Sequence, residues 1–153
     1  MKALWQVYLW LIGSQDGLKE YMSELEAWVA KAQISELFAE YAFAFDDQDA
    51  SAWSNLFAPN GIYEVQHPKI GAKISGHAEL IEFAQSNFED GVRHIQTSHI
   101  TELNGNTAHH KCAMSHVLTT PEKVIVCIAG WYETWLTKAD GDWKITHRIA
   151  YPD

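Results

Sequence analysis

The strongest constraint on the fold is a series of strand-like runs in the second half of the chain, separated by short turn signals. Asn104-Gly105 and Asp140-Gly141 are dipeptides typical of tight hairpin turns, and Pro121 lies between the second and third runs. β-Branched and aromatic residues, which favour strands, are frequent in these runs. Runs joined by such short turns are expected to pair as an antiparallel meander. The runs are residues 92–103, 107–119, 123–137 and 143–150.

The first half of the chain is predicted to be mainly helical. Gly13-Ser14 and Asp16-Gly17 are typical of loops. Ser23, followed three residues later by Glu26, fits a capping box and predicts a helix from there to about Asp46. Helices followed by a meander indicate an α+β fold. The other predicted elements are helices at residues 49–57 and 76–90 and short strands at residues 62–65 and 73–75.

The end of the first predicted helix carries two polar groups, Tyr41 and Asp46, on or beside an apolar face. The helix macrodipole disfavours an acid at a C-terminal end, so helix propensity does not explain Asp46. A buried partner would explain it. The alternative is an acidic loop formed by Asp46, Asp47 and Asp49. The apolar face consists of Leu37, Phe38, Tyr41, Ala44 and Phe45.

The length of 153 residues suits one domain. We expect residues 22–153 to form it and to bury roughly 70% of the surface that the unfolded chain exposes. Residues 1–21 are predicted to be an N-terminal extension. Its apolar run, residues 3–12, is too short to span a bilayer, and the flanking sequence does not favour a signal peptide.

Composition restricts the partners that the protein can have. The chain contains 20 acidic and 11 basic residues, and its net charge of −9 disfavours binding to nucleic acid or to an anionic membrane. Cys112 and Cys127 lie in strand-like runs and form no CxxC pair. We therefore expect buried, reduced thiols and a cytoplasmic protein, with a disulfide between neighbouring strands as the alternative.

Several short motifs occur along the chain in a characteristic order and spacing. They are Tyr41-x4-Asp46, Trp53, residues 56–61, Gly76-His77, His94-x2-Thr97-Ser98, residues 104–108, Gly130-x-Tyr132 and Gly141-x-Trp143-x-Ile145-x2-Arg148. With them, residues 23–148 resemble the SnoaL-like branch of the NTF2-like (cystatin-like α+β barrel) superfamily. The resemblance implies an α+β cone, in which a strongly curved mixed or antiparallel sheet wraps around a long N-terminal helix. Enzymes and non-catalytic proteins share this fold, so it does not specify an activity.

Within the superfamily, the chain is similar to lyases that use an Asp–His pair. These include scytalone dehydratase, the bile-acid 7α-dehydratases and hexachlorocyclohexane dehydrochlorinase. The resemblance implies that Asp46 and His94 are the catalytic pair and that Tyr41 and Arg148 are further catalytic residues. The residues expected to bind the substrate are Tyr63, Tyr132, His116, Trp53 and Met114.

An Asp–His pair suits the β-elimination of water or halide. A neutral imidazole can remove a proton next to the leaving group, because its pKa lies near the operating pH. An aspartate on the other ring nitrogen fixes the tautomer and stabilises the imidazolium. Arg148 would hold Asp46 ionised or bind developing negative charge. The expected function is a cofactor-independent, dehydratase-type lyase that acts on a small hydrophobic cyclic molecule and needs no metal.

Two other functions stay open. One is a proton-shuttling isomerase resembling ketosteroid isomerase. The other is a non-catalytic module for ligand binding or assembly, like the small subunits of ring-hydroxylating dioxygenases. Such a module predicts a pocket filled by side chains and no carboxylate within hydrogen-bonding reach of His94. The distance from His94 to Asp46, and whether both open on one cavity, should therefore discriminate between them.

The roles of the other histidines depend on strand register. A three-residue loop at residues 104–106 would place His116 across from His94, whereas a two-residue loop would place Ser115 there. On a regular strand, His94 and His99 face opposite sides and cannot share a metal, which disfavours zinc. The remaining histidines near turns and helix starts are expected to be surface or structural: His67, His77, His109 and His110.

Strand parity also predicts an outer face of the sheet. If Tyr132 points inward, Trp131 and Trp135 on the same run point outward. Two tryptophans on one exposed face would form an apolar patch unless another subunit covered it. We therefore expect a homo-oligomer, with the trimer of the lyase relatives preferred over a dimer.

Overall fold

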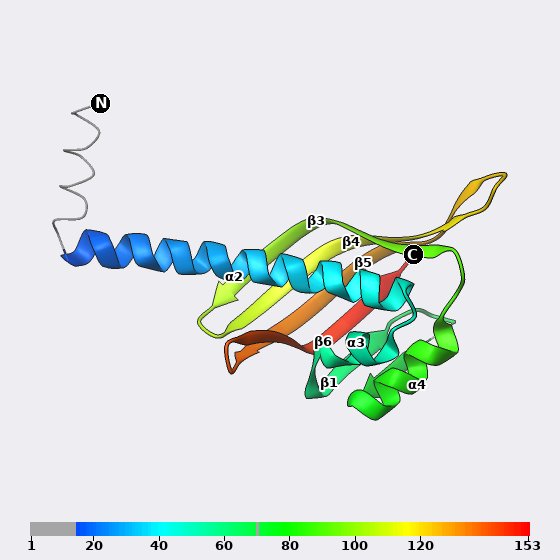
Figure 1. The fold of residues 1–153 in the computed structure, drawn as a ribbon, viewed down its shortest axis with the longest axis horizontal. Helices are drawn as coiled ribbons and strands as arrows, with labels where there is room; N and C mark the ends of the chain where they lie inside the picture. The colour runs from blue at the N-terminus through cyan, green and yellow to red at the C-terminus, as the bar shows by residue number, and fades with distance from the viewer. Residues whose placement is uncertain (1–14, 70) are drawn as a thin grey trace. The chain divides into compact units, whose positions relative to one another are not determined.

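A computed structural model describes residues 15–69 and 71–153 (Figure 1). Residues 1–14, which include the apolar run and the predicted loop at Gly13-Ser14, lie outside the described residues. The chain divides into two compact units, residues 1–34 and 35–153, and helix α2 (Gln15–Asp46) contributes to both. The sheet and the candidate site belong to the second unit.

Helix α2 begins at Gln15, so the predicted start near Ser23 is wrong. Asp16-Gly17, predicted to be a loop, is helical, and Ser23 lies within the helix. Residues 18–22 are mostly good helix formers, so nothing separates them from the helix that follows. A capping-box pattern therefore marks a helix start only where the preceding residues resist helix formation.

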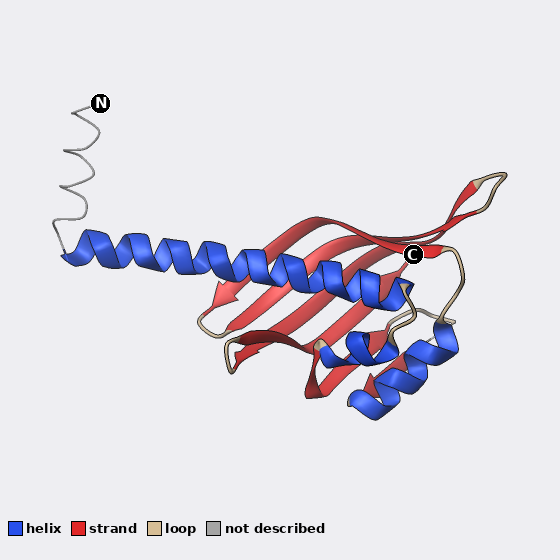
Figure 2. Cartoon of the chain, viewed as in Figure 1, coloured by secondary structure: helices blue, strands red, loops and turns tan. Residues whose placement is uncertain are grey.

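The second unit is built on one six-stranded sheet with the strand order β2-β1-β6-β5-β4-β3 (Figure 2). β1 and β6 pair in parallel, and the other neighbouring strands pair antiparallel. The predicted α+β class and the four-stranded meander are confirmed. The strands are β1 (Phe57–Val65), β2 (Ala72–Ser75), β3 (Val92–Asn104), β4 (Thr107–Thr119), β5 (Val124–Ala139) and β6 (Asp142–Pro152), and the two short helices are α3 (Ala50–Asn55) and α4 (His77–Asn87).

The last turns of α2 pack against the inner face of this sheet. Phe38 stacks on His110 of β4 with ring centroids 4.2 Å apart, and Tyr41 meets Tyr132 of β5 edge-on at 6.3 Å. Phe45, one turn further along, lies 4.9 Å from the His94 ring. The three- and four-residue spacing of the apolar residues thus places them on one buried face, as predicted.

Helix α3 contributes buried residues to this core. Asp49 caps the helix, because its carboxylate accepts a hydrogen bond of 2.8 Å from the backbone N–H of Ala52. Trp53 is fully buried and packs on Tyr41, with ring centroids 5.5 Å apart, and on Phe45 at 5.4 Å. Asp49 is therefore the cap of α3 and not part of an acidic loop.

Strand β1 continues through Pro59-Asn60-Gly61, where the sequence predicted a break. The strand is irregular there, since its register against β6 shifts between Phe57 and Ile62. A Cβ atom on Gly61 would lie 2.8 Å from the carbonyl oxygen of Ile145. Glycine thus permits a close approach of the two strands where the sequence indicated only a turn.

A bulge in β3 sets the register of the inner face. Thr97 pairs with Ala113 and Ile100 with Lys111, so two residues, Ser98 and His99, lie opposite one residue of β4. Ser98 adopts a φ of 57°, which accommodates the extra residue.

The turn that follows has two residues, Gly105-Asn106, because Asn104 pairs with Thr107. Together, this turn and the bulge place His116 directly across from His94. The sequence predicted that pairing only for a three-residue loop. His116 does pair with His94, but the bulge in β3 produces this pairing and a longer loop does not.

The outer face of β5 carries the two predicted tryptophans. Tyr132 is 1% exposed, whereas Trp131 and Trp135 are 37% and 38% exposed, so the predicted orientations are confirmed. Trp131 stacks on Tyr151 of β6 with ring centroids 5.0 Å apart.

The two cysteines are both free but differ in burial. Cys112 is buried as predicted, and Cys127 is exposed, which corrects the sequence-based expectation. The register of β5 against β4 shifts between His116 and Val117, which pair with Ile128 and Val126. Cys127 is thus the extra residue of a second bulge. Among the described residues, no helix is long and apolar enough to cross a membrane.

Candidate active site

Asp46 and His94 meet where α2 ends and β3 begins. His94 Nδ1 lies 2.6 Å from Asp46 Oδ1, and the backbone N–H of His94 donates to the two carboxylate oxygens at 3.1 and 3.2 Å. The His94 side chain is 11% exposed and the Asp46 side chain is 5% exposed. The unexplained acid at the helix end therefore has a buried partner. Because the carboxylate accepts from Nδ1–H, the Nε2 atom of neutral His94 keeps its lone pair.

The surroundings of His94 favour the neutral imidazole. Burial lowers the pKa of His94 below its ordinary value of 6.5. The hydrogen bond and the negative charge of Asp46 oppose this shift, and the positive charge of Arg148 adds to it. A buried neutral imidazole next to an ionised carboxylate is the arrangement that a general base requires near neutral pH.

His116 of β4 lies directly against His94. The His94 and His116 rings have centroids 3.9 Å apart, and His116 Nε2 lies 3.3 Å from the hydroxyl oxygen of Tyr132. Burial, followed by the charge of His94, lowers the pKa of His116 to about 3. His116 is therefore neutral over the physiological range and can accept from or donate to Tyr132.

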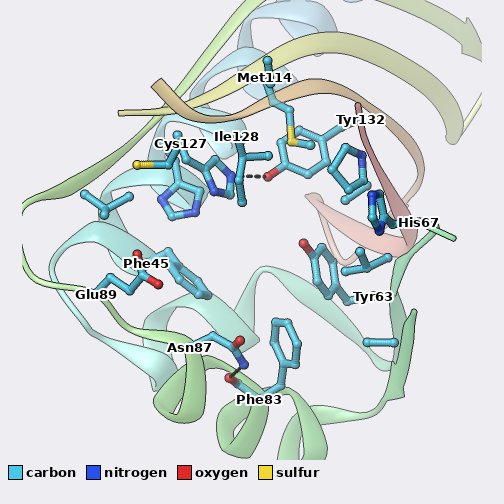
Figure 3. Close-up of a pocket in the computed structure, with 18 of the residues that line it drawn as sticks. Phe45, Tyr63, His67, Phe83, Asn87, Glu89, Met114, Cys127, Ile128 and Tyr132 are labelled. Carbon is cyan, nitrogen blue, oxygen red and sulfur yellow. Dashed lines mark hydrogen bonds between the residues drawn. The ribbon is translucent and has the colours of Figure 1, made fainter. Parts of the chain in front are cut away.

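A cavity of about 550 Å³ opens beside these residues. Figure 3 shows Met114 and Tyr132 on one side of the hollow and Phe83 and Asn87 of α4 on the opposite side. The lining is mainly apolar and aromatic, with a few polar groups that converge on the hollow. The lining includes Tyr41, Phe45, Asp46, Tyr63, Val65, His67, Phe83, Asn87, Glu89, Val92, His94, Met114, His116, Cys127, Ile128, Tyr132 and Ala150.

Three tyrosines supply hydroxyl groups to the cavity wall. Burial raises the pKa of Tyr41 and Tyr132 and raises that of Tyr63 well above its ordinary value. Each of the three also influences the pKa of at least one of the others, so the hydroxyls form one electrostatic cluster. Protonated hydroxyls at these positions can donate hydrogen bonds to a ligand.

Arg148 lies behind the cavity wall. It is fully buried, its Nη1 donates to Thr134 Oγ1 at 2.7 Å, and its Nη2 donates to Gln96 Oε1 at 2.6 Å. Its guanidinium carbon lies 3.8 Å from the ring centroid of Tyr132 and 4.3 Å from that of Tyr41. Arg148 neither lines the cavity nor forms an ion pair with a carboxylate of the described residues. The expected contact between Arg148 and Asp46 is thus replaced by cation–π contacts.

The remaining predicted residues divide into two groups. Met114, Tyr63, Tyr132 and His116 line the cavity with the Asp–His pair. Trp53 does not line it and instead supports Tyr41 and Phe45 from behind.

Sequence reasoning missed two partners of Arg148, Gln96 and Thr134. Thr134 pairs directly with Arg148 across β5 and β6, so strand parity could have identified it two residues after Tyr132. Gln96 shares the inner face with His94, two residues earlier on β3. A buried arginine needs acceptors, and an inward polar residue on a neighbouring strand is the signal for one.

A model of the SnoaL-like domain matches residues 26–149. The chain belongs to the SnoaL-like family. No functionally curated protein matches this SnoaL-like chain in sequence.

Solved structures share the fold of this SnoaL-like domain. Rv3472, a protein of unknown function from Mycobacterium tuberculosis, is 28% identical with a TM-score of 0.76, over 84% of this chain and 74% of that one. An NTF2-like protein with a cystatin-like fold from Novosphingobium aromaticivorans is 20% identical with a TM-score of 0.80, over 91% and 92% of the two chains. LinA is 17% identical with a TM-score of 0.73, over 86% and 90%. At these identities, the last two matches establish the fold alone.

Proposed function

We propose that this SnoaL-like domain is a cofactor-independent lyase that eliminates water or halide from a small hydrophobic cyclic substrate, with His94 as general base. The observation that carries the proposal is the 2.6 Å contact between His94 Nδ1 and Asp46 Oδ1 in the wall of an open cavity of about 550 Å³. A non-catalytic module predicts neither the contact nor the open cavity. Both observations therefore support an enzyme.

The base step follows from the tautomer of His94. Its Nε2 removes a proton from the carbon next to the one that bears the leaving group. The electron pair of that C–H bond forms the new double bond, and the bond to the leaving group breaks. Asp46 stabilises the imidazolium that results, since it already accepts from Nδ1–H. The proton on Nε2 then passes to solvent or to the leaving group.

The tyrosine hydroxyls supply the acid side of the reaction. A leaving hydroxide must be protonated to depart as water, whereas a halide needs only a hydrogen-bond donor. Tyr63 and Tyr132 line the cavity, and burial raises the pKa of both, so they hold the protons to donate. The positive charge of Arg148 behind Tyr132 favours negative charge that develops near these hydroxyls.

The walls of the cavity support this substrate class. Pockets of about 300–1,000 Å³ suit small organic ligands, and the cavity falls within that range. Phe45, Phe83 and Met114 offer flat or flexible apolar contacts. His94, His116 and Tyr132 add polar groups to the lining that contact one another. A ring compound with one or two polar substituents fits this division.

A panel of hydroxylated and halogenated ring compounds should identify a substrate by thermal shift, followed by assays for a released halide or a new double bond. His94→Gln and Asp46→Asn should each reduce turnover by about 10²–10⁴-fold while leaving the circular dichroism spectrum unchanged. His147→Gln is the matched control, because His147 contacts Glu64 and does not line the cavity.

Full activity in both His94→Gln and Asp46→Asn would overturn the assignment of the pair. A product with the composition of the substrate would identify the reaction as an isomerisation. Substrate deuterated at a candidate carbon reports which carbon loses its proton, through the loss of the label and a primary isotope effect.

A further inference from the structure

A second cluster of reactive side chains lies on the β3–β4 hairpin, outside the lining of the cavity. It consists of His99, His110 and Cys112, whose potential ligand atoms all lie within 4.8 Å of one another. Strand parity predicted that His94 and His99 face opposite sides, but the bulge at Ser98-His99 breaks this parity. His99 therefore faces His110 on the inner side of the sheet, where Phe38 packs.

We propose that His99 Nδ1, His110 Nε2 and Cys112 Sγ form a binding site for a thiophilic metal ion such as Zn²⁺. Two imidazole nitrogens and one thiolate are ligands that such ions prefer. The site is separate from the Asp–His pair and does not depend on the proposed elimination.

The spacing of the two nitrogens fits a shared metal ion. His99 Nδ1 and His110 Nε2 lie 3.2 Å apart. Two nitrogens bound to zinc at tetrahedral angles, each about 2.0–2.1 Å from the ion, are separated by about 3.3 Å. The sulfur atom of Cys112 lies within 4.8 Å of both nitrogens.

One nitrogen of each ring has a hydrogen-bond partner of its own, which leaves His99 Nδ1 and His110 Nε2 available for a metal ion. His99 Nε2 lies 3.3 Å from the carbonyl oxygen of Gln96, which can only accept, so Nε2 carries the proton and Nδ1 a lone pair. His110 Nδ1 lies 2.8 Å from Thr101 Oγ1. If His110 donates there, its Nε2 also offers a lone pair to the metal. Metal-binding histidines commonly make such second contacts.

The positive charge of Arg148 acts on the Cys112 thiol. Arg148 is fully buried, and its Nε atom has no hydrogen-bond partner among the described residues. Cys112 and Arg148 both donate to Gln96 Oε1, at 3.5 and 2.6 Å, so the thiol and the guanidinium lie in one network. Burial raises the pKa of Cys112, and the charge of Arg148 opposes that shift. On metal binding, the Cys112 thiol would release its proton to solvent, and the metal-bound thiolate would give Arg148 a nearby anion.

Without a metal, the same histidines can form a hydrogen-bond chain from Thr101 through His110 and His99 to Gln96. That chain does not include Cys112. Cys112 is therefore the residue that distinguishes a metal site from a purely structural network. His99 is exposed while His110 and Cys112 are each 1% exposed, so a water molecule can reach a fourth coordination position beside His99.

The test uses Co²⁺ as a spectroscopic probe for the full chain, after treatment with a chelator and a reductant. We expect one Co²⁺ per chain, with the intense visible bands of a tetrahedral site and a thiolate-to-cobalt charge-transfer band in the near ultraviolet. Zn²⁺ should displace the probe and raise the Tm.

Matched variants assign the ligands. Cys112→Ser should abolish the charge-transfer band, and Cys127→Ser, which alters the exposed thiol, should retain it. His99→Gln changes an exposed residue, and thus provides a folded test even if Cys112→Ser unfolds. Thr101→Val should weaken Co²⁺ binding by about 10–100-fold, because it removes the outer contact of His110.

The absence of a charge-transfer band in the wild type would overturn the proposal. An unchanged band in Cys112→Ser, or unchanged affinity in His99→Gln, would overturn it as well, since either result would locate the metal elsewhere.

Discussion

The imidazole of His94 faces that of His116 across β3 and β4, with ring centroids 3.9 Å apart. Two buried imidazolium ions this close would repel each other strongly, so the structure favours a neutral pair. The same preference holds for His110, where burial, followed by the charge of Arg148, lowers the pKa to about 3. Three histidines of the inner face thus resist protonation in the folded state.

The first prediction concerns stability and pH. The folded-state pKa values of His94, His110 and His116 lie below the ordinary value of 6.5, so in acid the unfolded chain binds protons that the folded chain does not. The stabilisation is complete above pH 6.5 and is lost as the pH falls from 6.5 toward 3. Each histidine contributes at most about 1.4 kcal/mol per pH unit in this window. Urea unfolding between pH 7 and 5 measures the slope, and His116→Asn should reduce it. A slope that this variant leaves unchanged would contradict the assignment.

The second prediction concerns the pKa of His94. The hydrogen bond and charge of Asp46 both raise this pKa, so Asp46→Asn should lower it further. An NMR titration of the His94 ring measures the change. Glu89→Gln is the matched control, because Glu89 is the last of the contributions to this pKa and should shift it less. A His94 pKa that rises in Asp46→Asn would show that the carboxylate is not ionised next to the ring.

The third prediction concerns Arg148. Arg148→Met removes the charged donors to the part-buried Gln96 Oε1 and to the buried Thr134 Oγ1. Each acceptor left without its charged donor costs about 1–3 kcal/mol, so the free energy of unfolding should fall by about 2–6 kcal/mol. Chemical denaturation measures the loss. Adding Gln96→Leu to Arg148→Met should cost less than the sum of the two single changes, and strict additivity would contradict the predicted coupling.

The fourth prediction concerns assembly. We propose that another copy of the chain covers the outer face of β5, where Trp131 and Trp135 are exposed, and that the assembly is a trimer or, less favourably, a dimer. Light scattering should then give a mass above that of one chain, and Trp131→Glu should reduce it toward the monomer. Phe43→Glu, which alters an exposed aromatic residue of α2, is the matched control. A monomeric wild type would refute the proposal.

Local patterns were sufficient for most of the fold. Alternating strand runs and glycine-containing turns identified β3 to β6, and the apolar face of α2 followed from the spacing of Leu37, Phe38 and Tyr41. The pairing of Asp46 with His94 was also accessible, because an acid at a helix C-terminus needs a partner and the family resemblance indicated which one. The strands and the apolar face of α2 depend on side-chain periodicity, which the sequence displays directly.

Tertiary structure alone decided the register and the second cluster. The bulge at Ser98-His99 depends on how β3 and β4 pair along their whole length. No local sequence signal marks it. That bulge sets His116 against His94 and brings His99 to His110 and Cys112. The partners of Arg148 were hidden for the same reason: they lie on other strands, and only the assembled sheet brings them within hydrogen-bonding distance. The sequence by itself thus determined which elements form and which residues could react. Strand pairing, a sum of many weak contacts between distant segments, decided which of those residues meet.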